Sequence, residues 1–303
     1  MNIKHIVING GGPTLFNAYG ALKQANLSGI WSHESVESYY GTSAGAIVSL
    51  LLALQYSWED LDDFIIKRPW QHVWKFSLMN VYEYYINKGI FGKDMFTDFL
   101  GPLLKGKDVD VSITLKEFHD IFKKTLYIYA IDLASFEVVE FSHMSHPDMP
   151  VLDAVRASSA LPILFQPVEY AGNLYTDGGF LLNYPLVKCT ADPKTILGLK
   201  NACVESSSNE VQGIFEYLSY ILNKIVDKLQ FSCTLETPYE LKINTGFIDY
   251  SVIYSLAKNA AERQSLINQG MEDALLSIKE FVKKGENVDL FTSSSQTLPN
   301  SSA

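Results

Sequence analysis

Two glycine-rich turns decide the fold: His5-Ile6-Val7-Ile8-Asn9-Gly10-Gly11-Gly12 and, further along, Gly41-Thr42-Ser43-Ala44-Gly45. Each turn follows a strand-like run and leads into an apolar helix. Strand, glycine turn and helix, twice in succession, begin a doubly wound sheet of parallel strands. The first turn can present bare backbone N–H groups, and the second can present a serine hydroxyl on a sharp bend. Together they have the parts that an acyl-transfer site needs.

The composition is that of a folded protein with a sizeable core. The chain has 303 residues, of which 47% are hydrophobic and 19% are charged. This length fits two domains or one large α/β domain with an insertion. We expect a single α/β domain over residues 1–284, with a helical, aromatic-rich insertion at about 58–104. The polar tail, residues 285–303, is expected to be disordered.

Charge and cysteine usage exclude several classes of partner. The net charge of −10 argues against nucleic acid, which needs clustered Lys and Arg, and against polybasic attachment to anionic membranes. Cys189, Cys203 and Cys233 form neither a disulfide framework nor a paired metal motif, so we expect buried free thiols in a reducing compartment. We see no signal peptide, and the apolar run Ala46–Leu54 is far shorter than the ~20 residues of a membrane span. We therefore expect a cytoplasmic or intracellular protein whose membrane contact is peripheral.

Hydrophobic periodicity predicts the remaining elements. The predicted hairpins join Leu126–Asp132 to Phe136–Phe141 and Pro167–Tyr170 to Asn173–Thr176. The other predicted elements are helices at Val151–Ser159, Glu210–Leu229 and Glu262–Lys284, and strands at Thr195–Leu199 and Tyr239–Asn244.

The aromatic residues between Trp58 and Leu104 allow two interpretations. One is ordinary core packing of a subdomain beside the sheet. The other is a surface that meets lipid or lines an acyl channel, because aromatic side chains suit membrane interfaces.

Ser43 is the candidate nucleophile. Glycines on both sides let the chain bend sharply where a strand meets a helix, and the N–H groups at the helix start favour a nearby oxyanion. The alternative is a tight turn in which Ser43 only caps the helix. Gly10, Gly11 and Gly12 are candidate oxyanion-hole donors. The alternative for them, nucleotide binding, is disfavoured because Leu15 breaks the G-x-G-x-x-G spacing and no G-K-S/T sequence follows.

A serine nucleophile needs a base, and Asp177 is the best candidate. No histidine follows it: the histidines are His5, His33, His72, His119, His143 and His146. A histidine-dependent site would need Asp132 with His143 or His146. Asp177 ends a predicted strand and precedes Gly178-Gly179, which also fits a plain turn. An Asp with an ordinary pKa near 3.9 is a poor base, but a desolvated site would raise the pKa.

These motifs resemble those of the patatin-like phospholipase family over roughly residues 4 to 190. The matching stretches are Gly10-Gly11-Gly12, Gly41-Thr42-Ser43-Ala44-Gly45, Ile131-Asp132-Leu133, Glu137–Phe141, Arg156–Pro162 with Phe165 and Pro167, and Asp177-Gly178-Gly179 with Asn183 and Pro185. The resemblance implies a three-layer α/β/α sandwich and a calcium-independent Ser–Asp dyad that hydrolyses lipid acyl esters without metal or cofactor. By this resemblance Ser43 is the nucleophile, Asp177 activates it, and the N–H groups of Gly10, Gly11 and Gly12 hold the oxyanion.

One departure from the family pattern stands beside the glycine loop. The family usually has Arg or Lys two positions after the third glycine, where this chain has Thr14. From the matching motifs, the first hypothesis is a phospholipid or lysophospholipid acyl hydrolase with no nucleotide and no nucleic acid as partner. The second is a non-catalytic lipid- or acyl-binding protein of the same fold, and the third is a histidine-dependent esterase.

Overall fold

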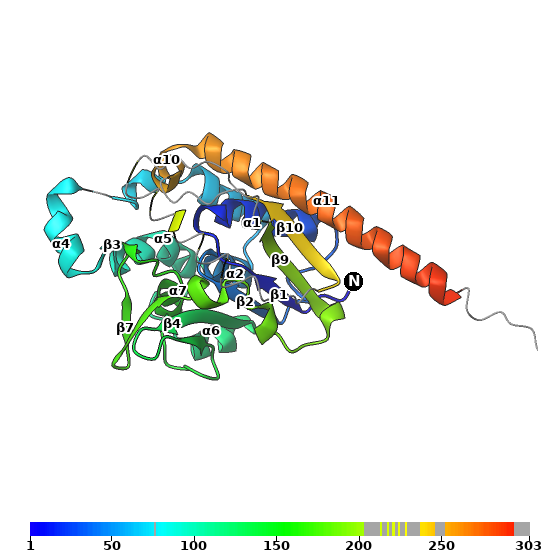
Figure 1. Ribbon diagram of the computed structural model, residues 1–303, viewed down its shortest axis with the longest axis horizontal. Coiled ribbons are helices and arrows are strands. Elements are labelled where there is room, and N and C mark those ends of the chain that lie inside the picture. The colour runs from blue at the N-terminus through cyan, green and yellow to red at the C-terminus, as the bar shows by residue number, and fades with distance from the viewer. Residues whose placement is uncertain are drawn as a thin grey trace, which may run out of the picture.

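The computed structural model describes residues 1–75, 77–202, 237–245 and 252–293, with a few single positions between 213 and 228. A mostly parallel sheet forms its centre (Figure 1). The predicted helix Glu210–Leu229 lies largely outside the described residues, as do Cys203 and Cys233. Cys189 is a buried free thiol. No helix of the described part is both long and apolar enough to cross a bilayer.

Within the described residues the central sheet has eight strands in the order β10-β9-β1-β2-β4-β8-β7, with β5 also paired to β4. The first five strands in this order run parallel, while β5, β7 and β8 add antiparallel pairs. Their bounds are β1 His5–Ile8, β2 Ser38–Thr42, β4 Thr125–Asp132, β5 Glu137–Phe141, β7 Val168–Tyr170, β8 Asn173–Asp177, β9 Ile196–Ala202 and β10 Tyr239–Asn244. A small separate sheet pairs β3 Gly89–Phe91 with β6 Ile163–Phe165. Both predicted hairpins and the strand at 239–244 are confirmed.

Helices and apolar contacts cover both faces of the sheet. The α-helices are α1 Leu15–Leu27, α2 Ala44–Ala53, α3 Trp58–Asp62, α4 Val81–Ile86, α5 Lys93–Lys105, α6 Leu115–Phe122, α7 Val151–Ser158, α8 Gly179–Leu182, α10 Ile253–Lys258 and α11 Ala260–Ser293. Ile6 and Ile8 of β1 point into the larger core beneath α1 and α2, while Val7 points into a smaller core with Tyr184 and Leu186. Burial on both faces explains the continuous apolar run of β1. The predicted α/β fold with a mostly parallel central sheet is confirmed.

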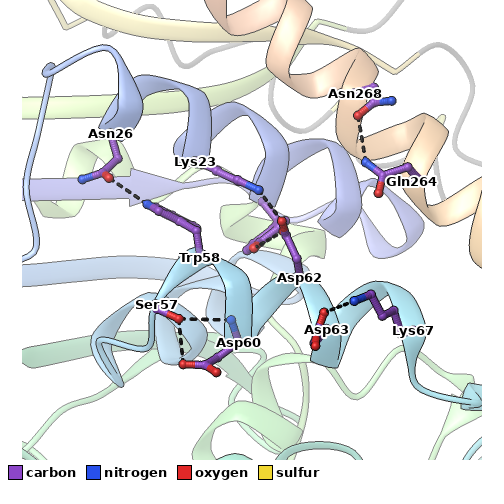
Figure 2. A network of polar contacts seen from close by, with 11 residues as sticks. Lys23, Asn26, Ser57, Trp58, Asp60, Asp62, Asp63, Lys67, Gln264 and Asn268 are labelled. Atoms are coloured by element: carbon purple, nitrogen blue, oxygen red, sulfur yellow. Dashed lines mark hydrogen bonds and ion pairs between the residues drawn. The ribbon is translucent and has the colours of Figure 1, made fainter.

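The start of the aromatic segment is fastened to α1 by polar contacts (Figure 2). Asp62 of α3 accepts hydrogen bonds from Tyr19 and Lys23 of α1, the former at 2.8 Å. The indole N–H of Trp58 donates to Asn26 Oδ1 at 2.8 Å. These contacts fix the segment against the sheet layer, so its first residues belong to the body of the domain.

The C-terminal helix α11 corrects the expectation for the tail. It packs along α1 and β10 and extends through Ser293, beyond the predicted end at Lys284 (Figure 1). Residues 285–293 are therefore helical where we expected disorder, because extending a helix that packing has already nucleated costs less than starting a new one. Residues 294–303 lie outside the described part of the chain.

A buried arginine connects α11 to α10 and to the segment 63–67. Arg263 is only 2% exposed. Its guanidinium donates to the carbonyl oxygens of Leu256, Ile66 and Arg68. Burial lowers its pKa from the ordinary arginine value. These bonds join α10 and the end of the segment 63–67 to α11.

We predict that Arg263→Met destabilises the fold, because the carbonyl oxygens of Leu256 and Ile66 lose the guanidinium as a donor, while that of Arg68 keeps the N–H of Trp70. The expected loss in the free energy of unfolding is roughly 2–4 kcal/mol, measured by urea denaturation. Lys279→Met, at an exposed position of the same helix, is the control and should change stability little. Equal stability of the two variants would contradict this role of Arg263.

Candidate active site

Ser43 lies on a strained turn between β2 and α2. Its backbone has φ 54° and ψ −124°, a region that non-glycine residues rarely adopt. Its N–H donates to Ser158 Oγ at 2.9 Å, and that hydroxyl donates onward to the carbonyl oxygen of Tyr129 at 2.6 Å. Gly45 lets α2 approach β1, since a Cβ there would lie 2.3 Å from the carbonyl oxygen of Ile8. The turn is thus held by contacts from α7, β4 and β1.

The structure brings Ser43 and Asp177 together. Ser43 Oγ donates a hydrogen bond to Asp177 Oδ2 at 2.7 Å, and the N–H of Gly179 donates to Asp177 Oδ1 at 2.7 Å. Asp177 is 4% exposed. Burial raises its pKa to about 6, and the bonds from Ser43 and Gly179 partly oppose that rise. The carboxylate is therefore oriented by backbone on one side and aimed at the hydroxyl on the other.

Strand β4 is the reason that residues 43 and 177 meet. Thr42, the last residue of β2, is paired with Tyr129, while Asp177, the last residue of β8, is paired with Ala130. Neighbouring positions of one strand therefore hold the ends of two strands that are far apart in sequence. Because β2 is parallel and β8 antiparallel to β4, both approach the same point from opposite directions.

The glycine loop lies at the carboxyl end of β1, next to this point, and its three N–H groups differ in their hydrogen bonding. The N–H of Gly10 donates to the carbonyl oxygen of Asn183 at 2.9 Å, so it is already occupied. The oxyanion role of Gly10 stays a prediction, and in this structure its N–H is engaged by the chain that returns against the loop after Asp177. The N–H groups of Gly11 and Gly12 have no hydrogen-bond partner among the described residues, and Gly12 has a positive φ of 53°.

Two asparagines that the sequence reasoning did not assign hold the glycine loop. Asn201 Nδ2, at the end of β9, donates to the carbonyl oxygen of Gly10 and to Thr14 Oγ1, both at 3.1 Å. Asn183 Nδ2 also donates to the Gly10 carbonyl, at 3.4 Å. Thr14, which replaces the usual cation of the family, is thus a buried partner in this network. Asn183 belongs to the region that resembles the family, but the resemblance assigned it no role. Asn201 lies beyond the matching region.

An apolar pocket opens beside Ser43 and Asp177. It encloses about 830 Å³ of space, including the solvent-filled space at its mouth. Gly12, Ser43, Ala44 and Asp177 form its polar end. Its other lining residues are apolar except for Ser159: Pro13, Leu15, Phe16, Ile47, Leu51, Ile65, Trp70, Trp74, Phe99, Ser159, Leu161, Phe165, Ile253, Leu256 and Ala257. The aromatic segment therefore contributes both core packing and part of the pocket wall.

The histidine-dependent alternative is not supported by the geometry. His143 stacks on His119 with ring centroids 3.8 Å apart, and His146 packs against Phe141. Asp132 Oδ1 accepts the N–H of Ala134 in the β4–β5 turn at 2.7 Å. These side chains are engaged elsewhere and none lines the pocket at Ser43. Among the described residues, no cluster of His, Cys, Asp and Glu could hold a metal ion.

Comparison with known proteins shows the family and the fold of this chain. Residues 6–188 match the family model described as patatin-like phospholipase. The chain is 24% identical over 264 residues to an uncharacterized protein of Acanthamoeba polyphaga mimivirus, covering 86% of each chain. It is 26% identical over 185 residues to a probable lipid hydrolase of Invertebrate iridescent virus 6, covering 60% of this chain and 62% of the relative. The crystal structure of VipD from Legionella pneumophila has the same fold, with a TM-score of 0.56 and 15% identity over 93% of this chain and 67% of VipD.

The family model, matched over residues 6–188, supports lipid hydrolysis as the general activity. The chain belongs to the patatin-like phospholipase family.

We predict that Asn201→Ala loosens the glycine loop. The Gly10 carbonyl loses a buried donor, and unfolding should become easier by roughly 1–3 kcal/mol. Lipid hydrolysis should show a lower kcat, by about tenfold, with little change in KM, because a positioning residue acts on the transition state more than on substrate binding. Asn268→Ala, at an exposed site on α11, is the control. A changed KM with an intact kcat would contradict this positioning role.

We also predict that Asp177→Asn stabilises the protein at alkaline pH. The folded-state pKa of about 6 exceeds the ordinary value near 3.9, so the protonated carboxyl favours the folded state. That stabilisation is complete below pH 4 and is lost as the pH rises through 6. At pH 8 the variant should be more stable than the wild type by roughly 2–3 kcal/mol in urea unfolding, and by less at pH 5. Asp120→Asn, an exposed change, should show no such pH dependence.

Proposed function

We propose that the protein hydrolyses the carboxylic ester bonds of phospholipids or lysophospholipids through a Ser43–Asp177 dyad and an acyl-enzyme intermediate. The single observation that carries the proposal is the 2.7 Å hydrogen bond from Ser43 Oγ to Asp177 Oδ2 at the polar end of an apolar pocket. A hydroxyl within hydrogen-bonding distance of a buried carboxylate has the geometry of a nucleophile with its general base.

In the proposed first step Ser43 Oγ attacks the ester carbonyl carbon while its proton moves to Asp177 Oδ2. The carbonyl oxygen becomes an oxyanion. In this scheme the N–H groups of Gly11 and Gly12 donate hydrogen bonds to it. The N–H of Ala44 at the start of α2 is well placed to assist, since it follows the nucleophile on the pocket side. Each such donor is worth about 3–4 kcal/mol to the transition state.

The tetrahedral intermediate then collapses, and the leaving alcohol takes the proton from Asp177. The acyl group stays on Ser43 as an ester. In the second half of the reaction Asp177 removes a proton from water, which attacks this ester and releases the fatty acid. Asp177 finally returns that proton to Ser43 Oγ, so the cycle balances without a histidine. Its raised pKa of about 6 makes it a competent base near neutral pH.

The pocket supports a lipid acyl chain as the group beside the scissile ester. Its walls are apolar and aromatic and begin at Ser43, so a hydrocarbon chain would gain burial while the ester lies at the polar end. The family membership favours phospholipids among acyl esters. A second candidate, a non-catalytic acyl-binding protein, was suggested by Thr14. The hydrogen bond from Asn201 to Thr14 favours catalysis, because it holds the glycine loop in place. The usual cation of the family would lie beside this loop.

We predict that Ser43→Ala and Asp177→Asn each lower phospholipid or lysophospholipid hydrolysis by about a thousandfold or more, because nucleophile and base act as a unit. Release of fatty acid from a lipid panel measures this. A fluorophosphonate probe should label the wild type at residue 43 and fail to label Ser43→Ala. The wild-type kcat/KM should rise tenfold per pH unit below about pH 6 and level off above it.

The double variant His143→Ala/His146→Ala is the matched control and should retain activity. Full activity in folded Asp177→Asn would reject the dyad. A wild-type protein that binds lipid but neither hydrolyses it nor reacts with the probe would favour the acyl-binding candidate.

A further inference from the structure

A short helical arm, residues 77–88, carries apolar side chains that the fold leaves in solvent. Its helix α4 has no buried residue. Large apolar side chains of the arm are exposed at Met79 by 92%, Val81 by 54%, Tyr82 by 75%, Tyr85 by 79% and Ile86 by 52%. Figure 1 shows α4 standing away from the sheet at the far left of the molecule. Such a concentration on one short element is a mark of an interaction surface.

The arm has a defined shape and a defined face. Tyr84 Oη accepts the N–H of Ser77 at 3.0 Å, which closes the arm on itself. Met79 lies in the short helical turn just before α4, and Tyr82 and Tyr85, three residues apart in α4, lie on one side of that helix. Each tyrosine of the arm has a polar hydroxyl on an apolar ring. Such side chains suit the boundary between headgroups and acyl chains.

Both ends of the arm are rooted in the wall of the apolar pocket. Trp74, just before the arm, and Phe91, just after it, are in contact with ring centroids 5.2 Å apart. Each also contacts Phe165, at 6.0 Å and 5.8 Å. Trp74 and Phe165 line the pocket, and strand β3 at the end of the arm pairs with β6. Whatever the arm touches is therefore adjacent to the pocket.

The charge of the chain decides which lipid surface fits. The net charge is −10, so an anionic membrane would repel the protein as a whole. Between residues 75 and 88 the charged side chains are Lys75, Glu83 and Lys88, which is too few cations for electrostatic attachment. Binding through this arm would thus depend on buried apolar area and would favour an uncharged surface.

We propose, on the basis of the lipid hydrolysis proposed above, that the arm inserts its exposed face into a zwitterionic lipid surface and places the pocket over it. A phospholipid then moves from the surface along the aromatic wall to Ser43 without crossing open water. The arm is a docking element and takes no part in the chemical step.

The test uses the full chain carrying Ser43→Ala, so that binding is measured without hydrolysis. Sedimentation with phosphatidylcholine vesicles should show that Met79→Ser/Tyr82→Ser/Tyr85→Ser lowers partitioning by about tenfold or more. Leu27→Ser/Phe136→Ser/Met144→Ser removes exposed apolar side chains elsewhere and should leave partitioning unchanged. The arm variant should keep the wild-type unfolding temperature, because α4 buries none of its residues. Added salt should not weaken binding.

A second comparison uses the active chain. The arm variant should hydrolyse a water-soluble short-chain ester within about twofold of the wild type, and vesicle phospholipid about tenfold more slowly. Unchanged vesicle binding by the arm variant would overturn the proposal. Salt-sensitive binding that requires phosphatidylserine would also overturn it, as would a wild-type dimer that the arm variant dissociates while vesicle binding persists. A wild type inactive on both esters would instead reject the proposed function, whatever the binding result.

Discussion

The pairing of β4 with two other strands is the constraint on which the site depends. β4 holds the end of β2 at Tyr129 and the end of β8 at Ala130, so its backbone hydrogen bonds set the separation of Ser43 and Asp177. The carbonyl oxygen of Tyr129 also accepts a hydrogen bond from the Ser158 hydroxyl. That hydroxyl in turn accepts a hydrogen bond from the N–H of Ser43. A slip of one residue in either register would turn the corresponding side chain to the other face of the sheet.

The same geometry places two unfavourable features side by side. Ser43 occupies a strained backbone region, which costs on the order of 1–3 kcal/mol, and Asp177 is a carboxylate buried at 4% exposure. Neither would persist on a mobile loop. Here the strain is opposed by the Ser158 relay and the burial by the bonds from Ser43 and Gly179. Reactivity is thus kept at the expense of stability.

Sequence patterns predicted what depends on local chemistry. The glycines around Ser43, the apolar run of β1 and the Asp-Gly-Gly turn each have a periodic or steric signal, and they predicted the fold and the contact between Ser43 and Asp177. The partners that form only through folding had no such signal. Asn201 and Ser158 act through one hydrogen-bonding group each, and Gly10 lost its N–H to a carbonyl from a distant segment. The extension of α11 to Ser293 had no local signal, because the Gly, Asn, Val, Asp, Thr and Ser residues of this stretch are weak helix formers.

In the proposed mechanism, a carboxylate base simplifies the architecture of the site. An imidazole base has two nitrogens, so a third residue is normally needed to fix its tautomer and orientation. A carboxylate has two equivalent oxygens, and here the N–H of Gly179 orients one while the other faces Ser43. The requirement that replaces the third residue is desolvation, because an exposed Asp would be too acidic to act near neutral pH. Burial at the end of β8, against β4 and below the apolar pocket, supplies that condition through the fold itself.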